Sequence, residues 1–211
     1  MLLKICGMCD ADNIRAVEAA ARPDMMGFIF WPASSRYCHT LPAYMPGVGV
    51  ERVGVFVDAQ TDDIVARAKT FGLHRLQLHG HECPDRCCEV HEATGLPVIK
   101  ALRVETTADV AAARDYANAV SMLLFDTRTL LPGGSGRQFD WSILSAYDVE
   151  LPFLLSGGIG PDDINALTTF QHPRCAGFDV NSRFEFSPGI KDANALAAFA
   201  SAMRQPLNIE H

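Results

Sequence analysis

Short apolar runs rich in Val, Ile, Leu and Phe recur along the whole chain, and each is followed by a longer segment that is alanine-rich or apolar at helical spacing. Runs of this length are typical of buried strands, and the longer segments are typical of helices. The predicted strands are residues 2–6, 25–30, 52–57, 75–79, 98–102, 122–126, 153–156 and 177–181. The predicted helices are residues 10–20, 62–71, 84–93, 107–116, 141–146, 161–169 and 192–203.

Several of these helices start at a residue whose side chain can accept a hydrogen bond from the free N–H groups of the first turn. One starts at a proline, which fits the first turn because no N–H is needed there. The predicted start residues are Asp10, Thr61, Thr106, Asp140 and Pro161. Residues 41–50, after the second strand, hold several prolines and glycines and are not predicted to be helical.

Strands that alternate with helices pair in parallel through right-handed crossovers. Eight such units are the number found in a (β/α)8 TIM barrel. An open, doubly wound sheet is the alternative, but it usually has fewer strands. No linker or low-complexity segment divides the chain. We therefore expect an α/β protein with a single (β/α)8 barrel domain over residues 1–211.

The overall composition excludes some classes of function. The formal net charge of -7 argues against general nucleic-acid binding, which needs clustered Lys and Arg, although a local cationic pocket for a small anion remains possible. No apolar run approaches the roughly 18 residues of a membrane span, and the N-terminus lacks the features of a signal peptide. The seven cysteines are an odd number, which favours reduced thiols. We expect a cytoplasmic protein that binds neither membrane nor nucleic acid.

Polar side chains stand where four of the predicted strands end, and the carboxyl ends of the strands are where barrel active sites lie. These side chains are Cys6, His79, Asp126 and Asp179. Lys4 shares the face of Cys6, because alternate strand residues point to one side. An ammonium beside a thiol favours the thiolate, which can act as a base. Burial as a small apolar residue would explain Cys6 alone, but not four strands that end in this way.

Asp126 ends the apolar run 122–125 and is followed by a polar loop that contains Gly133, Gly134 and Gly136. A carboxylate at the tip of a buried strand is costly unless it has a task or a partner. Capping of its own turn is the alternative role for Asp126.

The loops after the seventh and eighth strands have the character of a phosphate site. Gly157 and Gly158 follow the seventh strand, and Asn181 and Ser182 follow the eighth. In many barrels these two loops bind phosphate, since glycine lets backbone N–H groups approach an anion. Arg36, in the second loop, is a cation that can bind a substrate carboxylate; its alternative role is that of a solvated surface residue.

Two thiol motifs offer competing functions. Cys6 and Cys9 form a C-x-x-C motif at a strand-to-helix junction, as in redox proteins, but eight βα units exceed a thioredoxin fold. The second motif, made of Cys83, Cys87, Cys88 and His91, has a spacing that matches no common zinc site. We expect no metal site there and a half-buried helix with reduced thiols.

The chain carries a set of short motifs in a characteristic order. They are Lys4-Ile-Cys-Gly7, Gly27-Phe-Ile-Phe30, Ser35-Arg36-Tyr37, Val53-Gly-Val-Phe-Val57, Leu76-Gln-Leu-His-Gly80, Phe125-Asp126, Gly133-Gly-Ser-Gly136, Phe139-Asp-Trp141, Ser156-Gly-Gly158, Asp179-Val-Asn-Ser182, Glu185 and Pro188-Gly-Ile-Lys-Asp192. With these motifs, which span essentially all of the chain, the sequence resembles the phosphoribosylanthranilate isomerase family. The first and last motifs in combination are highly specific, although each motif alone is not.

The resemblance implies an Amadori rearrangement of N-(5'-phosphoribosyl)anthranilate to 1-(o-carboxyphenylamino)-1-deoxyribulose 5-phosphate, a step of tryptophan biosynthesis that uses no cofactor and no metal. It implies that Asp126 is the general acid and that Cys6 is the general base. It further implies that Arg36 binds the anthranilate carboxylate and that backbone groups around Gly157, Gly158, Asn181 and Ser182 bind the phosphate. His79 and Asp179 are expected at the rim of this site.

The sequence departs from the family pattern in three places. Cys9 stands where a small polar residue is commoner, Ala33-Ser-Ser-Arg36 where Ser-Pro-Arg is common, and Asn181-Ser-Arg183 where Ser-Ser-Gly is frequent. We expect Arg183 to assist phosphate binding. The runner-up is an isomerase acting on a related aminoaldose of histidine biosynthesis, an enzyme that resembles a two-fold repeat not visible here. The oligomeric state is left open between monomer and homodimer.

Overall fold

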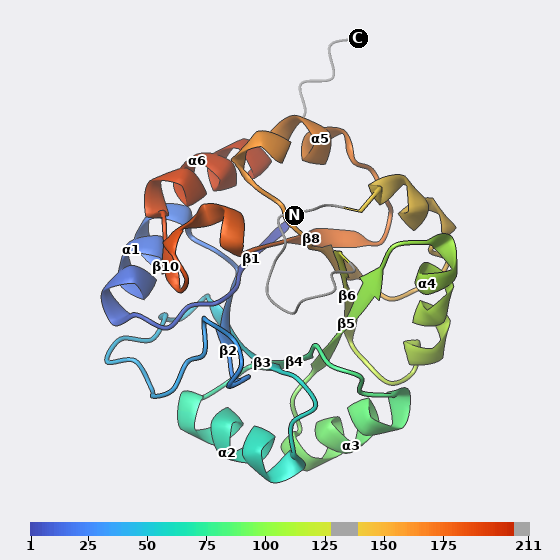
Figure 1. Ribbon diagram of the computed structural model, residues 1–211, viewed down its shortest axis with the longest axis horizontal. Coiled ribbons are helices and arrows are strands. Elements are labelled where there is room, and N and C mark those ends of the chain that lie inside the picture. Colours follow the sequence, from blue (N-terminus) through green and yellow to red (C-terminus); the bar gives the residue numbers. More distant parts are fainter. Residues whose placement is uncertain (128–138, 205–211) are drawn as a thin grey trace.

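The chain closes into a barrel of eight parallel strands, in which each strand is hydrogen-bonded to the next and β8 returns to β1 (Figure 1). The computed structural model describes residues 1–127 and 139–204. The barrel strands are β1 (Leu2–Ile5), β2 (Met25–Ile29), β3 (Glu51–Phe56), β4 (Arg75–Leu78), β5 (Val98–Val104), β6 (Met122–Thr127), β7 (Phe153–Leu155) and β8 (Cys175–Val180). The predicted (β/α)8 barrel is confirmed, and the open sheet is wrong.

Helices surround the barrel on its outside (Figure 1). They are α1 (Ala11–Ala21), α2 (Thr61–Phe71), α3 (Pro84–Thr94), α4 (Thr107–Ala111), α5 (Ile164–Thr169) and α6 (Ala193–Arg204), with the 3₁₀ helices η1 (Ala112–Tyr116), η2 (Trp141–Ala146), η3 (Pro161–Asp163) and η4 (Ser182–Phe184). No helix in the described part of the chain is long and apolar enough to cross a membrane. The segment 41–50 is not helical, as its prolines and glycines predict.

The helix starts follow the sequence, with one exception. Asp10 accepts a hydrogen bond from the Asn13 N–H (2.8 Å), and Thr106 takes part in a capping box. Asp140 likewise caps η2. The prediction that Thr61 caps its helix is wrong, because Thr61 is the first helical residue and Gln60 holds the N-cap position; the Thr61 hydroxyl donates to Glu89 instead.

Two features were not predicted. The predicted helices 107–116, 141–146 and 161–169 are wholly or partly 3₁₀, as is common for short connecting segments. A small antiparallel hairpin, β9 (Glu185–Ser187) and β10 (Ile190–Lys191), follows β8.

The predicted glycine loop with Gly133, Gly134 and Gly136 lies outside the described residues.

The strands separate two packed layers. Residues of one parity, such as Ile5, Phe28 and Phe125, pack against the surrounding helices. Residues of the other parity fill the lower barrel interior with an apolar cluster made of Met25, Val53, Ile99, Ala101, Met122, Leu124 and Leu154. Continuing this inward parity toward the carboxyl ends leads to polar residues, among them Lys4, Gln77 and Asp126. The interior is therefore an apolar floor below a polar upper layer.

Gly27 makes room for that polar layer. A Cβ atom at this position would lie 2.8 Å from the Cys6 Sγ and 3.3 Å from the Lys4 Nζ. Any side chain on β2 at this level would therefore displace the sulfur.

Candidate active site

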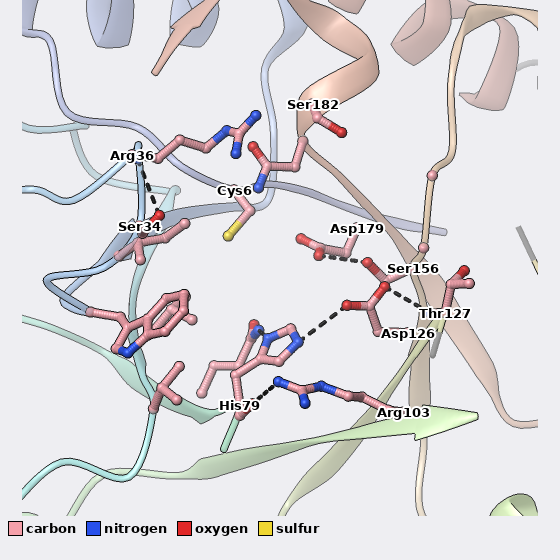
Figure 2. A pocket seen from close by; sticks show the side chains of 18 of the residues that line it. Cys6, Ser34, Arg36, His79, Arg103, Asp126, Thr127, Ser156, Asp179 and Ser182 are labelled. Atoms are coloured by element: carbon pink, nitrogen blue, oxygen red, sulfur yellow. Dashed lines mark hydrogen bonds and ion pairs between the residues drawn. The ribbon is translucent and has the colours of Figure 1, made fainter. Parts of the chain in front are cut away.

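A cavity opens at the carboxyl ends of the strands, and residues from all eight barrel strands or their following loops line it (Figure 2). All residues that the sequence predicted for the site, except Arg183, line this cavity; they are Cys6, Arg36, His79, Asp126, Gly157, Gly158, Asp179, Asn181 and Ser182. The structure thus brings together residues from both ends of the chain. Their individual roles stay predictions.

Cys6 stands beside a buried ion pair. The Lys4 side chain is fully buried, and its Nζ lies 2.7 Å from the Asp179 Oδ1. The other Asp179 oxygen accepts a hydrogen bond from the Ser156 hydroxyl (2.9 Å). Burial by itself lowers the pKa of Lys4, but the Asp179 carboxylate and the nearby Cys6 outweigh it, so this pKa is raised and the ammonium form is kept.

Burial raises the pKa of the Cys6 thiol, while Lys4 and Lys191 oppose this and Asp179 adds to it. The sequence predicted that Lys4 would favour the thiolate. That effect is present, but the loss of water around the sulfur outweighs it. A raised pKa leaves little thiolate at neutral pH, yet it makes the thiolate a stronger base once it forms.

This balance predicts how Cys6 titrates. We expect the ultraviolet absorbance of its thiolate, taken as the difference between wild type and Cys6→Ser, to rise with a midpoint above the ordinary value of about 8.5. Lys4→Met removes the ammonium group that does most to lower the Cys6 pKa, so the midpoint should move still higher. A midpoint below that of free cysteine would contradict the dominance of burial.

Asp126 is held on the opposite side of the cavity by two groups. Its Oδ1 accepts a hydrogen bond from the Thr127 N–H (2.8 Å), and its Oδ2 lies 3.1 Å from the His79 Nε2 (Figure 2). The Gln77 amide nitrogen lies 2.8 Å from the His79 Nδ1. With the amide as donor, His79 presents its Nε2–H to Asp126. The capping alternative for Asp126 concerns the segment after Thr127, which lies outside the described residues.

The loops after β7 and β8 form one wall. Gly157 and Gly158 have φ of 93° and 73°, a conformation that favours glycine. A Cβ on Gly157 would lie 2.6 Å from the Thr127 backbone nitrogen, so no larger residue fits. Arg183, expected to assist here, does not line the cavity; its Nη2 lies 3.5 Å from the Asp162 Oδ2.

Arg36 is buried and ion-paired. Its Nε and Nη2 both donate to the Glu185 carboxylate, at 2.6–3.0 Å. It is not the solvated surface residue of the alternative interpretation. Ser34 also fixes the loop, since its hydroxyl accepts from the Arg36 backbone N–H (3.1 Å).

The other cysteines are not part of this cavity. Cys9 is half-buried, and its thiol faces the Gly189 carbonyl at 3.9 Å. Cys83, which precedes α3, is exposed and Cys87, on α3, is buried; both are free. Within residues 1–127 and 139–204, no group of three or more His, Cys, Asp or Glu side chains is placed to hold a metal ion.

A sequence model of N-(5'-phosphoribosyl)anthranilate (PRA) isomerase matches residues 3–202. This chain belongs to the PRA isomerase family. The PRA isomerase of Phocaeicola vulgatus is 43% identical over 207 residues, which cover 98% of this chain and 100% of the relative.

Solved structures of the PRA isomerase family have the same fold. One, in complex with reduced 1-(o-carboxyphenylamino)-1-deoxyribulose 5-phosphate, is 29% identical, has a TM-score of 0.79 and covers 96% of this chain and 97% of its own. Another, from Thermotoga maritima, is described as monomers generated from a dimeric enzyme; it is 30% identical, with a TM-score of 0.78, and covers 96% and 97%.

The family motifs account for most of the cavity, but not for all of it. Trp31, Ser34 and Arg103 line it and were not predicted as site residues. Arg103 continues the inward parity of Ile99 and Ala101 at the end of β5, so the rule that identified Asp126 would have identified it too. Its Nη2 lies 3.5 Å from the His79 carbonyl oxygen.

Proposed function

We propose that residues 1–211 act as a single catalytic domain that converts N-(5'-phosphoribosyl)anthranilate to 1-(o-carboxyphenylamino)-1-deoxyribulose 5-phosphate, with Cys6 as base and Asp126 as acid. This is the isomerase reaction of its family, in tryptophan biosynthesis. The observation that carries the assignment is that the Cys6 thiol, directly after β1, and the Asp126 carboxyl group, on β6, face one shared cavity (Figure 2).

The first step is ring opening. Asp126 in its protonated form donates its proton to the furanose ring oxygen, and the C1'–O bond breaks to give a protonated Schiff base. His79 contacts the Oδ2 of this carboxyl group and Thr127 the Oδ1, so the acid has a fixed orientation. Asp126 is left as a carboxylate.

The second step is proton removal at C2'. The positive imine withdraws electrons and makes this C–H acidic, and the Cys6 thiolate accepts the proton to give an enolamine. Ketonisation then needs a proton at C1' and the loss of the C2' hydroxyl proton. The Cys6 thiol and the Asp126 carboxylate can supply and accept these protons, so each returns to its starting form. The cycle moves protons only and consumes no redox equivalents.

The cavity carries matching groups for the two anions of the substrate. Arg36 binds the anthranilate carboxylate, and Gly157, Gly158, Asn181 and Ser182 bind the phosphate. Arginine and glycine-rich backbone are the groups that proteins favour for these anions. Asp179 holds Lys4 beside Cys6 and therefore acts as a positioning residue. The small phosphorylated substrate is the only partner that we propose, apart from a second copy of the chain in a homodimer; the cytoplasm is the proposed location.

Turnover by the purified protein tests the proposal. We expect loss of the anthranilate-type fluorescence of the substrate without added metal or cofactor. The related aminoaldose of histidine biosynthesis should not be converted, because a site built for a carboxylate-bearing aromatic ring does not match it. Turnover of that compound alone would favour the runner-up, and the absence of both activities would favour a redox or binding role for Cys6 and Cys9.

A further inference from the structure

A cluster of buried charges lies beside the cavity and involves residues that acid–base chemistry does not use. Glu185 and Lys191, from the β9–β10 hairpin, have side chains that are 4% and 0% exposed. Glu185 pairs with Arg36, in the loop after β2, and Lys191 contacts Asn181, at the end of β8. Arg36 is proposed to bind the carboxylate of the substrate, and Asn181 is one of the residues proposed to bind the phosphate at its other end.

The contacts are short and directional. The Lys191 Nζ donates to the Glu185 Oε1 and to the Asn181 Oδ1, both at 2.6 Å. The Glu185 carboxylate also accepts hydrogen bonds from the Nε and Nη2 of Arg36 and from the Gly189 N–H (3.1 Å). The chain of contacts from Arg36 through Glu185 and Lys191 to Asn181 is thus continuous.

The cluster holds two cations and one anion, which leaves one net positive charge. Burial alone would raise the pKa of Glu185, but Arg36 and Lys191 outweigh it and the pKa is lowered, which keeps the carboxylate ionised. Burial lowers the pKa of Lys191, and Glu185 opposes this. Burying three charges is costly unless the pairing is good, so a cluster placed beside a binding cavity calls for a functional reason.

The backbone around the cluster is fixed as well. Asn13, near the start of α1, exchanges two hydrogen bonds with the Lys191 backbone, at 2.9 and 2.8 Å. Gly7 lies between the side chains of Arg36 and Asn181 and packs closely against both. A Cβ on Gly7 would lie 2.8 Å from the Arg36 Cδ and 2.8 Å from the Asn181 Oδ1. These contacts tie the hairpin to α1 and to the end of β8.

We propose that Glu185 and Lys191 are positioning residues that set the spacing between the carboxylate-binding Arg36 and the phosphate-binding Asn181. The inference rests on the proposed roles of Arg36 and Asn181. Glu185 occupies the Nε edge of the guanidinium, so that the remaining Nη1 edge is available to the substrate. Lys191 fixes the Asn181 amide and adds the positive charge that a substrate with two anionic groups requires.

The experiment measures the Kd of the reduced product analogue, which carries both anions, and of the same compound without the carboxyl group. Glu185→Gln should raise the first Kd by about 10- to 100-fold, the loss expected when charge-assisted hydrogen bonds no longer hold Arg36, and should raise the second much less. Lys191→Met should raise both, and should weaken inhibition by inorganic phosphate.

The double variant separates position from charge. Glu185→Gln with Lys191→Met restores one net positive charge, that of Arg36, but not the geometry. We expect its Kd for the full analogue to stay raised. A return to the wild-type value would overturn the proposal, because neither Glu185 nor Lys191 would then be needed to hold Arg36 and Asn181 for binding.

A matched control comes from the other end of the barrel. Arg75 and Glu51 form another two-point Arg–Glu pair at the amino ends of β4 and β3. Glu51→Gln should leave every Kd unchanged. Unchanged Kd values in both Glu185→Gln and Lys191→Met, in folded protein, would refute a positioning role.

Two further variants cover a failure of the first variants to fold and test the role of Arg36 separately. If the buried-charge variants do not fold, Asn13→Ala loosens Lys191 without removing a charge and should raise both Kd values in the same direction; no rise would end the proposal. Arg36→Met should remove the affinity that the carboxyl group adds. If it does not, the assigned role of Arg36 fails, whatever the outcome for Glu185.

Discussion

Cys6→Ser lowers kcat by about 10²- to 10⁴-fold or more, the contribution expected of a general base, while the protein stays folded. Serine is close to cysteine in size, so the contacts of Cys6 near Gly27 and Lys4 are kept. Its hydroxyl is far less acidic than a thiol, and an ammonium neighbour cannot ionise it at neutral pH. The residual rate should come from substrate binding and from Asp126. Steady-state kinetics together with thermal unfolding measure both parts of this prediction.

Cys9→Ala is the matched control for this substitution. Cys9 lies three residues along the chain and is half-buried, but it does not line the cavity. Its replacement should leave kcat unchanged. A large loss in Cys9→Ala together with near-normal turnover in Cys6→Ser would reverse our assignment and favour the redox interpretation.

Asp126→Asn lowers kcat by a similar factor, about 10²- to 10⁴-fold, because an amide cannot deliver a proton to the ring oxygen. Asparagine keeps the carbonyl oxygen that accepts the Thr127 N–H, and it still lies within reach of His79. The Kd of the reduced product analogue should therefore change little, since that compound is already ring-opened. The expected signature is a loss in kcat with retained affinity for the analogue.

The chain offers a second His–Asp pair as a control. Asp58 and His81 are in contact at 2.9 Å, and neither residue lines the cavity. Asp58→Asn should leave turnover nearly intact. Comparable losses of kcat in Asp58→Asn and Asp126→Asn would indicate a structural effect of His–Asp pairs rather than proton donation by Asp126.

Much of the site was predictable, because strand parity and the alternation of strands with helices are local properties of the sequence. Once residues 122–126 are identified as a strand with inward-facing Met122 and Leu124, Asp126 must face the barrel mouth. The same rule places Cys6 above Lys4. Arg103 follows the rule equally well, although no motif drew attention to it.

The partners of Arg36 and Lys4 were not predictable in this way. Arg36 is 149 residues from Glu185 along the chain, and Lys4 is 175 residues from Asp179. Only closure of β8 onto β1 and the return of the β9–β10 hairpin bring these groups into contact. Glu185 was visible as part of a motif, but its position against the guanidinium depends on a hairpin that the sequence pattern did not reveal.

The sequence by itself determined the number of βα units and the inward face of each strand, and hence which strand positions face the cavity, because these follow from periodicities of two and about 3.6 residues. The tertiary structure alone decided how readily the Cys6 thiol ionises. The pKa of the Cys6 thiol is raised despite its cationic neighbour, because the closed barrel removes water from around the sulfur. Loss of water depends on packing from every strand at once, and no local pattern of residues encodes it.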